Sequence, residues 1–519
     1  MAPGEPIAER NAKDPSTLAT DYLEPGAPYV NANKLARKLS PRQVQMIAIG
    51  GTIGTGLFLG TGKALATGGP ASMLISYTIC GVIVFITMLS LGEMAAFIPV
   101  AGSFCTFAGR FVDDALGFAL TWNYWFNDAV STASDIIALQ LLLEFMASLL
   151  KVVTIIIFII LGIVVNCGAN TQHKYIGNKY FYTGEAPFVG GIGGFASVFV
   201  TASFAYGGTE SIAITAGETK DPAKNLPRVV RNVFWRIILF YIVSIVLIGL
   251  DVPYNYPNLS SETTATSPFT IVFVEAGSAV AGSFINAVIM TSVISAANHA
   301  LFAGSRLLYT LAVDGYAPRF FGHLNRFQVP WVAVLATSVI SGLCFGASYI
   351  GAGQLWSWLQ NIVGVSNQLS WTFIGLASLR FRAAIRKQNL EHLLPYKNWT
   401  YPVGPVLAIG LNIILILVQG WSCFSPHFKA VDFVSYYIEL PIMLVMFLVW
   451  KLVKRTKLVK LEVMDLVTDR YNLEVVGGRE VEEDDGDGSN NGEGDGDGGW
   501  RSEKGVVGKV KKVGMWLFL

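Results

Sequence analysis

The feature that most constrains this chain is the recurrence of apolar stretches of about 18 or more residues along most of its length. A helix rises 1.5 Å per residue, so each stretch is long enough to cross a hydrocarbon core of about 30 Å. Charged residues make up 14% of the chain, against about a quarter in soluble proteins, and apolar residues make up 52%. We therefore predict an all-α, polytopic membrane protein.

Polar breaks divide the apolar residues into eleven predicted spans. Their approximate bounds are 43–66, 71–99, 116–147, 148–166, 189–214, 233–252, 276–303, 330–350, 356–379, 403–424 and 433–452. Residues 1–40 are predicted to be a cytosolic N-terminal tail, 41–456 the transmembrane domain and 457–519 a cytosolic C-terminal tail. Residues 480–499 of this last tail are acidic and glycine-rich, a composition typical of disorder.

Lysine and arginine near span ends mark cytosolic loops. Basic clusters lie at 37–42, 220–231, 319–326, 380–387 and 451–460. The loop 251–267 has no Lys or Arg and contains the sequon that begins at Asn258, so it is predicted to be external, with Asn258 a glycosylation candidate. The sequon at Asn398 follows a basic cluster and is predicted to be cytosolic and unused. We expect this multi-pass protein at the plasma membrane.

The basic clusters conflict with the number of spans. Loops on one side of a membrane are separated by an even number of spans, and this holds for every cluster from Lys220 onward. Five predicted spans, however, separate the N-terminal cluster from Lys220. The break falls within 116–166, where two spans abut at 145–148 with no loop between them. We therefore predict that one helix is missing, through a skipped exon or a faulty gene model, or in a genuine shortened isoform.

The first predicted span is unusually rich in glycine, with Gly50, Gly51, Gly54, Gly56 and Gly60. Each glycine costs a helix interior about 1 kcal/mol relative to alanine, so we predict an interruption. Unpaired backbone in a membrane is tolerated beside a cavity or a ligand, and the following half-helix N-terminus suits a carboxylate. Close helix packing is the alternative. A dinucleotide-binding loop is rejected, because these glycines do not follow a strand.

A second span repeats this pattern. Residues 204–210 place the pair Gly207-Gly208 and the carboxyl group of Glu210 in mid-membrane. Two interrupted spans that are far apart in the chain predict a binding site between two structural halves. A carboxylate inside a membrane is costly unless it is paired or faces water, so Glu210 is predicted to be functional, with a structural cap as the alternative.

These glycine motifs, with Gly68-Gly69-Pro70, Gly92-Glu93-Met94 and the stretch from Gly217-Glu218 to Arg228, resemble the fungal amino acid permeases of the amino acid–polyamine–organocation superfamily. The resemblance covers about residues 36–470. It implies twelve spans, of which the first ten form two inverted repeats of five and two more follow. The missing span is then the fourth. The resemblance also implies a secondary transporter with no cofactor and a proton gradient as its driving force.

The resemblance implies a substrate site at the two interrupted spans. The first would hold the α-carboxylate, the second would meet the α-amino group, and the eighth family helix would face the same cavity. The implied residues are Ile53, Gly54, Thr55 and Gly56 for the carboxylate, Phe204, Ala205 and Gly207 for the amino group, and Tyr206, Thr209, Ser292, Ser295 and Asn298 around them. His299 is a further titratable residue there, with a helix-packing histidine as the alternative.

Four charged residues are candidates for coupling and specificity. Lys151 is placed by the resemblance where sodium-coupled relatives bind a cation, so its protonation would be coupled to conformation, with snorkelling to the interface as the alternative. Glu210 is the second proton-coupling candidate. Asp128 and Asp135 lie seven residues apart on similar faces of one helix. The resemblance places an acidic residue at Asp135 in permeases for cationic substrates, whereas Asp128 replaces an aromatic residue without explanation.

We expect a proton-coupled amino acid importer that leans to lysine and arginine, with a non-transporting amino acid sensor on the same fold as the alternative. The five histidines and five cysteines are scattered, so neither an enzyme nor a metal site is expected. A net charge of +1 gives no reason to expect nucleic acid. The expected partners are a free amino acid and the lipid bilayer, and the cytosolic tails are candidate sites for trafficking or ubiquitin machinery.

Overall fold

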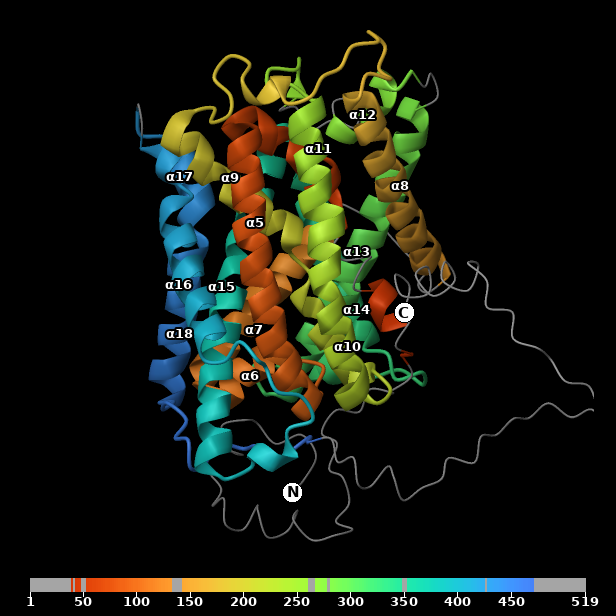
Figure 1. Cartoon of the computed structure of the whole chain (residues 1–519). Coiled ribbons are helices and arrows are strands. Elements are labelled where there is room, and N and C mark those ends of the chain that lie inside the picture. Colours follow the sequence, from red (N-terminus) through yellow and green to blue (C-terminus); the bar gives the residue numbers. More distant parts are fainter. Residues whose placement is uncertain are drawn as a thin grey trace, which may run out of the picture. The chain divides into compact units, whose positions relative to one another are not determined.

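The computed structural model describes residues 39–40, 43–47, 53–132, 142–259, 267–277, 281–347, 352–424 and 427–470. These residues form helices joined by loops (Figure 1), and within them the β pairing is a single bridge between Leu39 and Thr219. The all-α fold predicted from the apolar stretches is therefore confirmed.

The α-helices are joined by one π-helical segment, η3, and one nine-residue 3-10 segment, η2. In chain order they are α4 (Thr55–Phe58), α5 (Gly60–Phe97), α6 (Ser103–Phe111), α7 (Asp114–Thr132), α8 (Leu142–Asn166), α9 (Gly191–Tyr206), η2 (Glu210–Glu218), α10 (Pro222–Arg236), η3 (Ile237–Ile242), α11 (Val243–Asp251), α12 (Pro268–Glu275), α13 (Ala281–Val313), α14 (Trp331–Ala347), α15 (Ala352–Lys387), α16 (Val403–Val418), α17 (Ala430–Tyr437) and α18 (Glu439–Lys454). Short 3-10 turns are η1 (Lys179–Phe181), η6 (Arg319–Gly322), η8 (Glu391–Leu393) and η9 (Trp421–Cys423).

Five helices in the described part of the chain are long and apolar enough to cross a membrane. They are Gly60–Phe97, Pro222–Asp251, Gly282–Val313, Trp358–Lys387 and Val403–Cys423. A sixth is added if α17 and α18, which are bent by 46° relative to each other, form one span. A span that is interrupted, or that runs outside the described residues, is not one long continuous helix and is not among these five. The predicted number of eleven spans therefore stays a prediction.

The helix α5 contains a sharp turn between two of the predicted spans. Gly69 has a φ of +79°, and a Cβ at this position would lie 2.6 Å from the carbonyl oxygen of Pro187. Only glycine fits such a backbone at low cost. Pro70 then begins the second part of the helix, where its missing N–H would have had no helical partner. The predicted first and second spans are therefore separated at Gly69.

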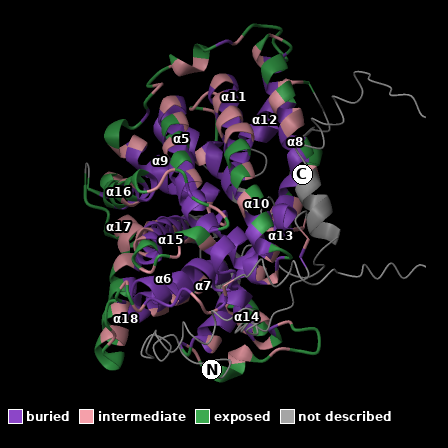
Figure 2. Ribbon diagram, turned by 60° about the horizontal axis from the view of Figure 1, so that its bottom comes forward, coloured by how far each residue is buried: buried purple, intermediate pink, exposed green. Residues whose placement is uncertain are grey.

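The helices pack in a pattern that repeats. α8 packs against α11 and α13, and α15 packs in the same way against α5 and α7, while α7 and α13 pack against each other. Figure 2 shows α7 and α15 largely buried and exposed residues along α16 and α18. The matching neighbours of α8 and α15 are what two related repeats would produce, because each is the last helix of its predicted repeat.

The helix α8 differs from the prediction at its start. It is continuous from Leu142 to Asn166, so the predicted span boundary at 147/148 is wrong. No glycine or proline interrupts residues 142–161, and this explains why one helix runs through the predicted junction.

The helices α7 and α8 run in the same direction. Asp114, which begins α7, accepts a hydrogen bond from Trp450 Nε1 near the basic end of α18 (2.9 Å). Asn166, which ends α8, donates one to Asp251 at the end of α11 (2.9 Å). α7 thus begins on the side of the basic clusters, and α8 ends on the side of the loop without Lys or Arg. Consecutive spans normally run in opposite directions, so the conflict found in the sequence persists in the structure.

The residues after α18 pack against the end of the domain that carries the basic clusters. The backbone N–H of Val459 donates to the carbonyl oxygen of Val112 at 2.9 Å, and Arg110 of α6 forms an ion pair with Asp469 at 3.0 Å. We call residues 456–470 the C-terminal strap. The C-terminal tail, predicted from residue 457, thus begins with a segment that belongs to the membrane domain. The acidic stretch 480–499 lies outside the described residues.

Candidate functional site

The two interrupted spans meet at small residues. α4 begins at Thr55, and the preceding Ile53 and Gly54 are not helical. A Cβ at Gly56 would lie 2.5 Å from Ala205 Cα in α9, and a Cβ at Gly54 would lie 3.2 Å from Ala296 Cβ in α13. The glycines of the first span therefore allow its backbone to approach both helices closely.

The second interruption is confirmed at Gly207 and Gly208. α9 ends at Tyr206, Gly207 is extended with ψ of 152°, and Gly208 has a φ of +81° before η2 begins. A Cβ at Gly207 would lie 2.1 Å from Asn367 Nδ2 of α15. The chain can make this turn because both residues lack a side chain. Residues 48–52 of the first interruption lie outside the described residues.

Protein groups already bond the carbonyl groups at the end of α9. Thr209 Oγ1 donates to Tyr206 O at 2.7 Å, Tyr241 to Ala205 O at 2.8 Å, and Asn367 to Ser203 O at 3.3 Å. A carbonyl oxygen has two lone pairs, so these bonds leave room for a second donor. The predicted contacts of Phe204, Ala205 and Gly207 with a substrate amino group stay predictions.

Tyr206 points toward α5. Its hydroxyl donates to the carbonyl oxygen of Tyr77 at 3.1 Å, and its ring stacks on Tyr241 with centroids 4.3 Å apart. The ring therefore joins the second interrupted span to α5 and to η3. The side chain of Tyr206 therefore points away from the predicted substrate site, and only its backbone could lie beside the substrate.

Glu210 lies fully buried at the start of η2. The hydroxyl of Tyr124 in α7 donates to its Oε1, and Trp371 Nε1 in α15 donates to its Oε2 at 3.1 Å. Sequence reasoning missed both donors. The sequence feature that could have identified them is a polar aromatic side chain in the middle of a predicted span. Tyr124 also lies one helical turn before Asp128.

Asp128 contributes a second carboxyl group to this region. It is 6% exposed, it interacts electrostatically with Glu210, and its Cβ would lie 3.0 Å from a Cβ at Gly304 of α13. Asp128, whose presence the sequence did not explain, thus lies between α7 and α13. Asp135 lies outside the described residues.

One face of α13 carries a row of buried polar groups. Ser292, Ser295 and His299 follow helical spacing and are at most 4% exposed. Within the described part of the chain, the two hydroxyl groups and His299 Nδ1 have no hydrogen-bond partner. Because the same face meets Gly54 through Ala296, these groups lie beside the first interruption, and their contact with a substrate stays a prediction.

Lys151 is fully buried in α8. It interacts electrostatically with His299 on α13. An amine that snorkels would reach the membrane surface, so burial contradicts that alternative. The proton-coupling role of Lys151 stays a prediction.

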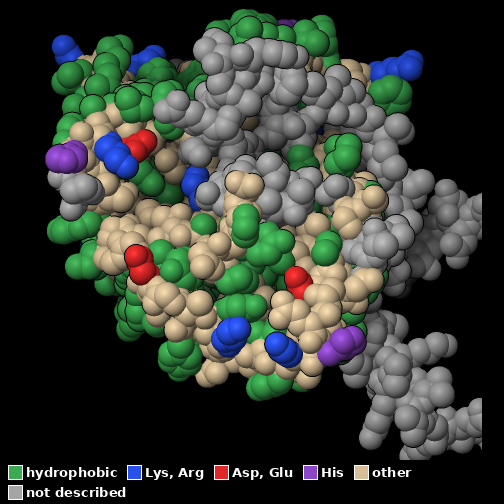
Figure 3. Space-filling model, turned by 90° about the horizontal axis from the view of Figure 1, so that it is seen from above, with side chains coloured by type: hydrophobic (Ala, Val, Ile, Leu, Met, Phe, Trp, Pro, Cys, Tyr) green, Lys and Arg blue, Asp and Glu red, His purple; other side chains and the backbone are tan. Residues whose placement is uncertain are grey.

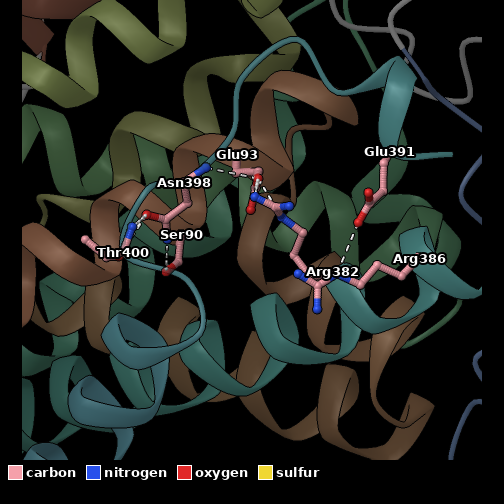
Figure 4. Close-up of polar contacts among 7 residues, drawn as sticks. All are labelled: Ser90, Glu93, Arg382, Arg386, Glu391, Asn398 and Thr400. Atoms are coloured by element: carbon pink, nitrogen blue, oxygen red, sulfur yellow. Dashed lines mark hydrogen bonds and ion pairs between the residues drawn. The ribbon is translucent and has the colours of Figure 1, made fainter.

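The motif Gly92-Glu93-Met94 lies at the end of the fold that carries the basic clusters. Glu93 accepts hydrogen bonds from Arg382 of α15 and from the backbone N–H of Asn398, and Asn398 Nδ2 donates to Ser90 Oγ at 3.1 Å (Figure 4). Asn398 is 3% exposed, which agrees with the prediction that its sequon is unused.

The opposite face, seen in Figure 3, carries scattered charged side chains. Asn258 is exposed in its loop.

Sequence comparison connects these features to known proteins. The model of the amino acid permease family matches residues 43–149 and 142–463. The chain belongs to the amino acid permease family.

Three relatives of this permease cover most of its length. A probable amino-acid permease of Schizosaccharomyces pombe is 45% identical over 491 residues, covering 85% of this chain and 96% of the relative. The lysine-specific permease LysP of Escherichia coli is 40% identical, with 82% and 95% covered. The basic amino-acid permease of Saccharomyces cerevisiae is 36% identical, with 85% of each chain covered. The protein is therefore a multi-pass membrane transporter of amino acids and not an enzyme.

Proposed function

We propose that this permease, in its complete form, imports cationic amino acids such as lysine and arginine across the plasma membrane by proton-coupled alternating access. The observation that carries the substrate class is the pair of buried carboxyl groups, Asp128 and Glu210, between α7, α13 and η2. Bringing a cation into low dielectric is costly, and two nearby carboxyl groups offset that cost. A neutral substrate would gain nothing from them.

The names of two relatives support the same class of substrate. One is a lysine-specific permease and another a basic amino-acid permease. These names describe the substrates of the two relatives. For this permease, the same substrate class is proposed because Asp128 and Glu210 are both buried carboxyl groups. Asp135 stays a second candidate for the countercharge.

Proton coupling is proposed through Lys151 and Glu210. Both side chains are fully buried and lie on elements that pack against α13. A buried ionisable group changes its protonation when its surroundings change, so alternating exposure to the two sides can move a proton with the substrate. No cofactor is required, since the proton gradient supplies the driving force.

The direct test is uptake of radiolabelled lysine, arginine and leucine in a transport-deficient host, with and without a protonophore. Proton-driven accumulation of lysine and arginine above leucine is expected. Equal uptake of all three would contradict the substrate class, and accumulation that resists the protonophore would contradict proton coupling. Binding without uptake would favour a sensor, provided that the scaffold is complete.

We infer that the scaffold lacks one helix, as the span parity predicts. The two family matches overlap at 142–149, so the family pattern is interrupted there. The alignment with the Schizosaccharomyces pombe relative has 491 positions but covers 85% of the 519 residues, about 441, so about 50 positions of the relative face gaps. A helix of about 20 residues with its loops fits this length. The parallel directions of α7 and α8 agree with a missing crossing.

The transcript across the codons for residues 132–150 tests this inference. A longer message would identify a skipped exon or a faulty gene model. If the mature message encodes the present junction, uptake by the chain as given is compared with uptake by a chimera that carries the corresponding segment of the Schizosaccharomyces pombe relative. Uptake by the chimera alone is expected, and uptake by the unmodified chain would contradict the inference.

A further inference from the structure

His299 is bonded to the second interruption through Ser211. The imidazole Nε2 contacts Ser211 Oγ, and Ser211 Oγ lies 2.5 Å from the carbonyl oxygen of Gly208. A hydroxyl group has one hydrogen, and the carbonyl can only accept it. Ser211 Oγ therefore accepts its other bond from Nε2–H of His299, which assigns the hydrogen of the neutral ring to Nε2.

This tautomer leaves Nδ1 as the proton-accepting atom. The ring is 4% exposed, and among the described residues none bonds to Nδ1. A buried acceptor without a donor is costly, and it is a place where a proton or a water can bind. The role of a packing histidine would not need a polar contact at Nε2 or an open Nδ1.

Lys151 is the charged neighbour of His299. It lies on α8, is fully buried, and interacts electrostatically with the imidazole. Two positive charges that interact in low dielectric repel each other. The pair therefore favours a single positive charge, on the amine or on the imidazole.

The other elements packed against α13 bring few charges to this pair. On η2, Glu210 is bonded to Tyr124 and Trp371, and on α7 Asp128 faces Gly304, five residues further along α13. α4 and α14 contain no charged residue. On the same elements, Asp114 of α7 accepts hydrogen bonds from Tyr316 and Trp450, and Glu218 of η2 pairs with Arg306 of α13. The remaining charged residues on neighbouring elements are Glu144 of α8, Glu275 of α12, which accepts a bond from Thr171, and Arg319 of η6.

We propose that His299 is a second proton-accepting residue of the coupling site, sharing one positive charge with Lys151 and transmitting its charge to the second interruption through Ser211 and Gly208. The proposal rests on the proposed proton coupling. A protonated imidazole donates a stronger, charge-assisted bond to Ser211 than the neutral ring does. Proton transfer to Nδ1 would thus hold η2 in the position seen here, and loss of that proton would weaken the hold.

Lysine binding by the purified chain, measured by calorimetry from pH 5 to pH 8, tests the proposal without requiring transport. The variants are His299→Gln, which keeps an N–H donor but takes no proton, Lys151→Met, and the double variant. His392→Gln on exposed η8 is the matched control. We expect the wild type and the control to change their Kd about fivefold or more across this range. Lys151→Met should keep a pH-dependent step that the double variant loses.

Each contrary result has a separate meaning. If neither the purified chain nor the chimera that carries the missing segment binds lysine, the proposed function is contradicted. Binding without pH dependence contradicts the coupling role of His299. An unchanged pH profile in His299→Gln, or identical profiles for Lys151→Met and the double variant, overturns the proposal alone. If the His299 variants are not monodisperse, Ser211→Ala serves instead, because it keeps the imidazole and removes its acceptor. The pH at which the Kd for lysine changes should shift in Ser211→Ala, and an unchanged pH midpoint would overturn the proposal.

Discussion

Arg382 Nη2 of α15 lies 2.7 Å from Glu93 Oε1 of α5, and the two side chains are 8% and 0% exposed. The pair joins helices that are 289 positions apart in the chain and belong to different predicted repeats. Removing one member of a buried ion pair leaves the other charge without compensation. This contact is therefore expected to hold the two halves together at the cytosolic end.

Glu93→Gln should lower the free energy of unfolding by about 3–5 kcal/mol. The matched control is Glu391→Gln, because Glu391 of η8 pairs with Arg386 of α15 at 3.1 Å but is 48% exposed. An exposed pair contributes about 0–1 kcal/mol. Thermal unfolding of the two purified variants measures the contrast, and equal losses would show that burial of the first pair adds nothing.

Asp128→Asn should weaken lysine binding about tenfold or more and leave leucine binding nearly unchanged, because only the cation loses a countercharge. Asp135→Asn is measured beside it as the second candidate, and it too should cost lysine far more than leucine. Competition binding with both amino acids provides the comparison. An equal loss for lysine and leucine in either variant would indicate a structural role for that residue.

Lys151→Ala should abolish pH-driven accumulation and spare exchange of substrate, since exchange needs no net proton movement. Accumulation is followed between external pH 5 and pH 7 in the form of the permease that transports. Counterflow of labelled against unlabelled substrate is the control for folding and binding. Accumulation that stays as large as in the wild type across this range would remove Lys151 from the coupling mechanism.

The C-terminal strap should lose stability in acid. Burial raises the pKa of Asp465, but the charge of Arg110 and the N–H groups of Val467 and Thr468 outweigh it, so the net pKa lies below its ordinary value. A carboxyl group with a depressed folded pKa stabilises the fold above its unfolded pKa, about 3.9, and this stabilisation disappears as the pH falls through the folded pKa. Thermal unfolding from pH 7 to pH 3 measures this loss.

The comparison for the strap is Asp465→Asn. At pH 7 this variant should be less stable than the wild type by on the order of 1 kcal/mol, and the difference should shrink below about pH 4. A difference that stays constant across the whole range would mean that the charge of Asp465 does not stabilise the strap.

The two sequons should behave differently. Asn258 is exposed in a loop without Lys or Arg, so Asn258→Gln should remove any glycosidase-sensitive shift in mobility. Asn398→Gln should leave that shift unchanged and lower the thermal midpoint instead, because the side chain of Asn398 donates to Ser90 and accepts from Thr400. A glycan on Asn398 would contradict both the cytosolic assignment and the burial.

Local features of the sequence were enough to predict the membrane class, the interruption at Gly207 and Gly208, and the family. Apolar length and glycine content act through neighbours along the chain, so they can be read without knowing which helices meet. The same reasoning placed one boundary wrongly, at 147/148, because span length alone does not define where α8 begins.

The partners of the buried polar groups were decided by the tertiary structure alone. Tyr124 and Trp371 reach Glu210 from two other helices, Arg382 reaches Glu93 across 289 positions, and Ser211 reaches His299 across 88. Each bond depends on the rotation and depth of two packed helices, and a single sequence contains neither quantity. A sequence therefore identifies the polar groups that must be satisfied inside a membrane, whereas the packing of the helices determines which groups satisfy them.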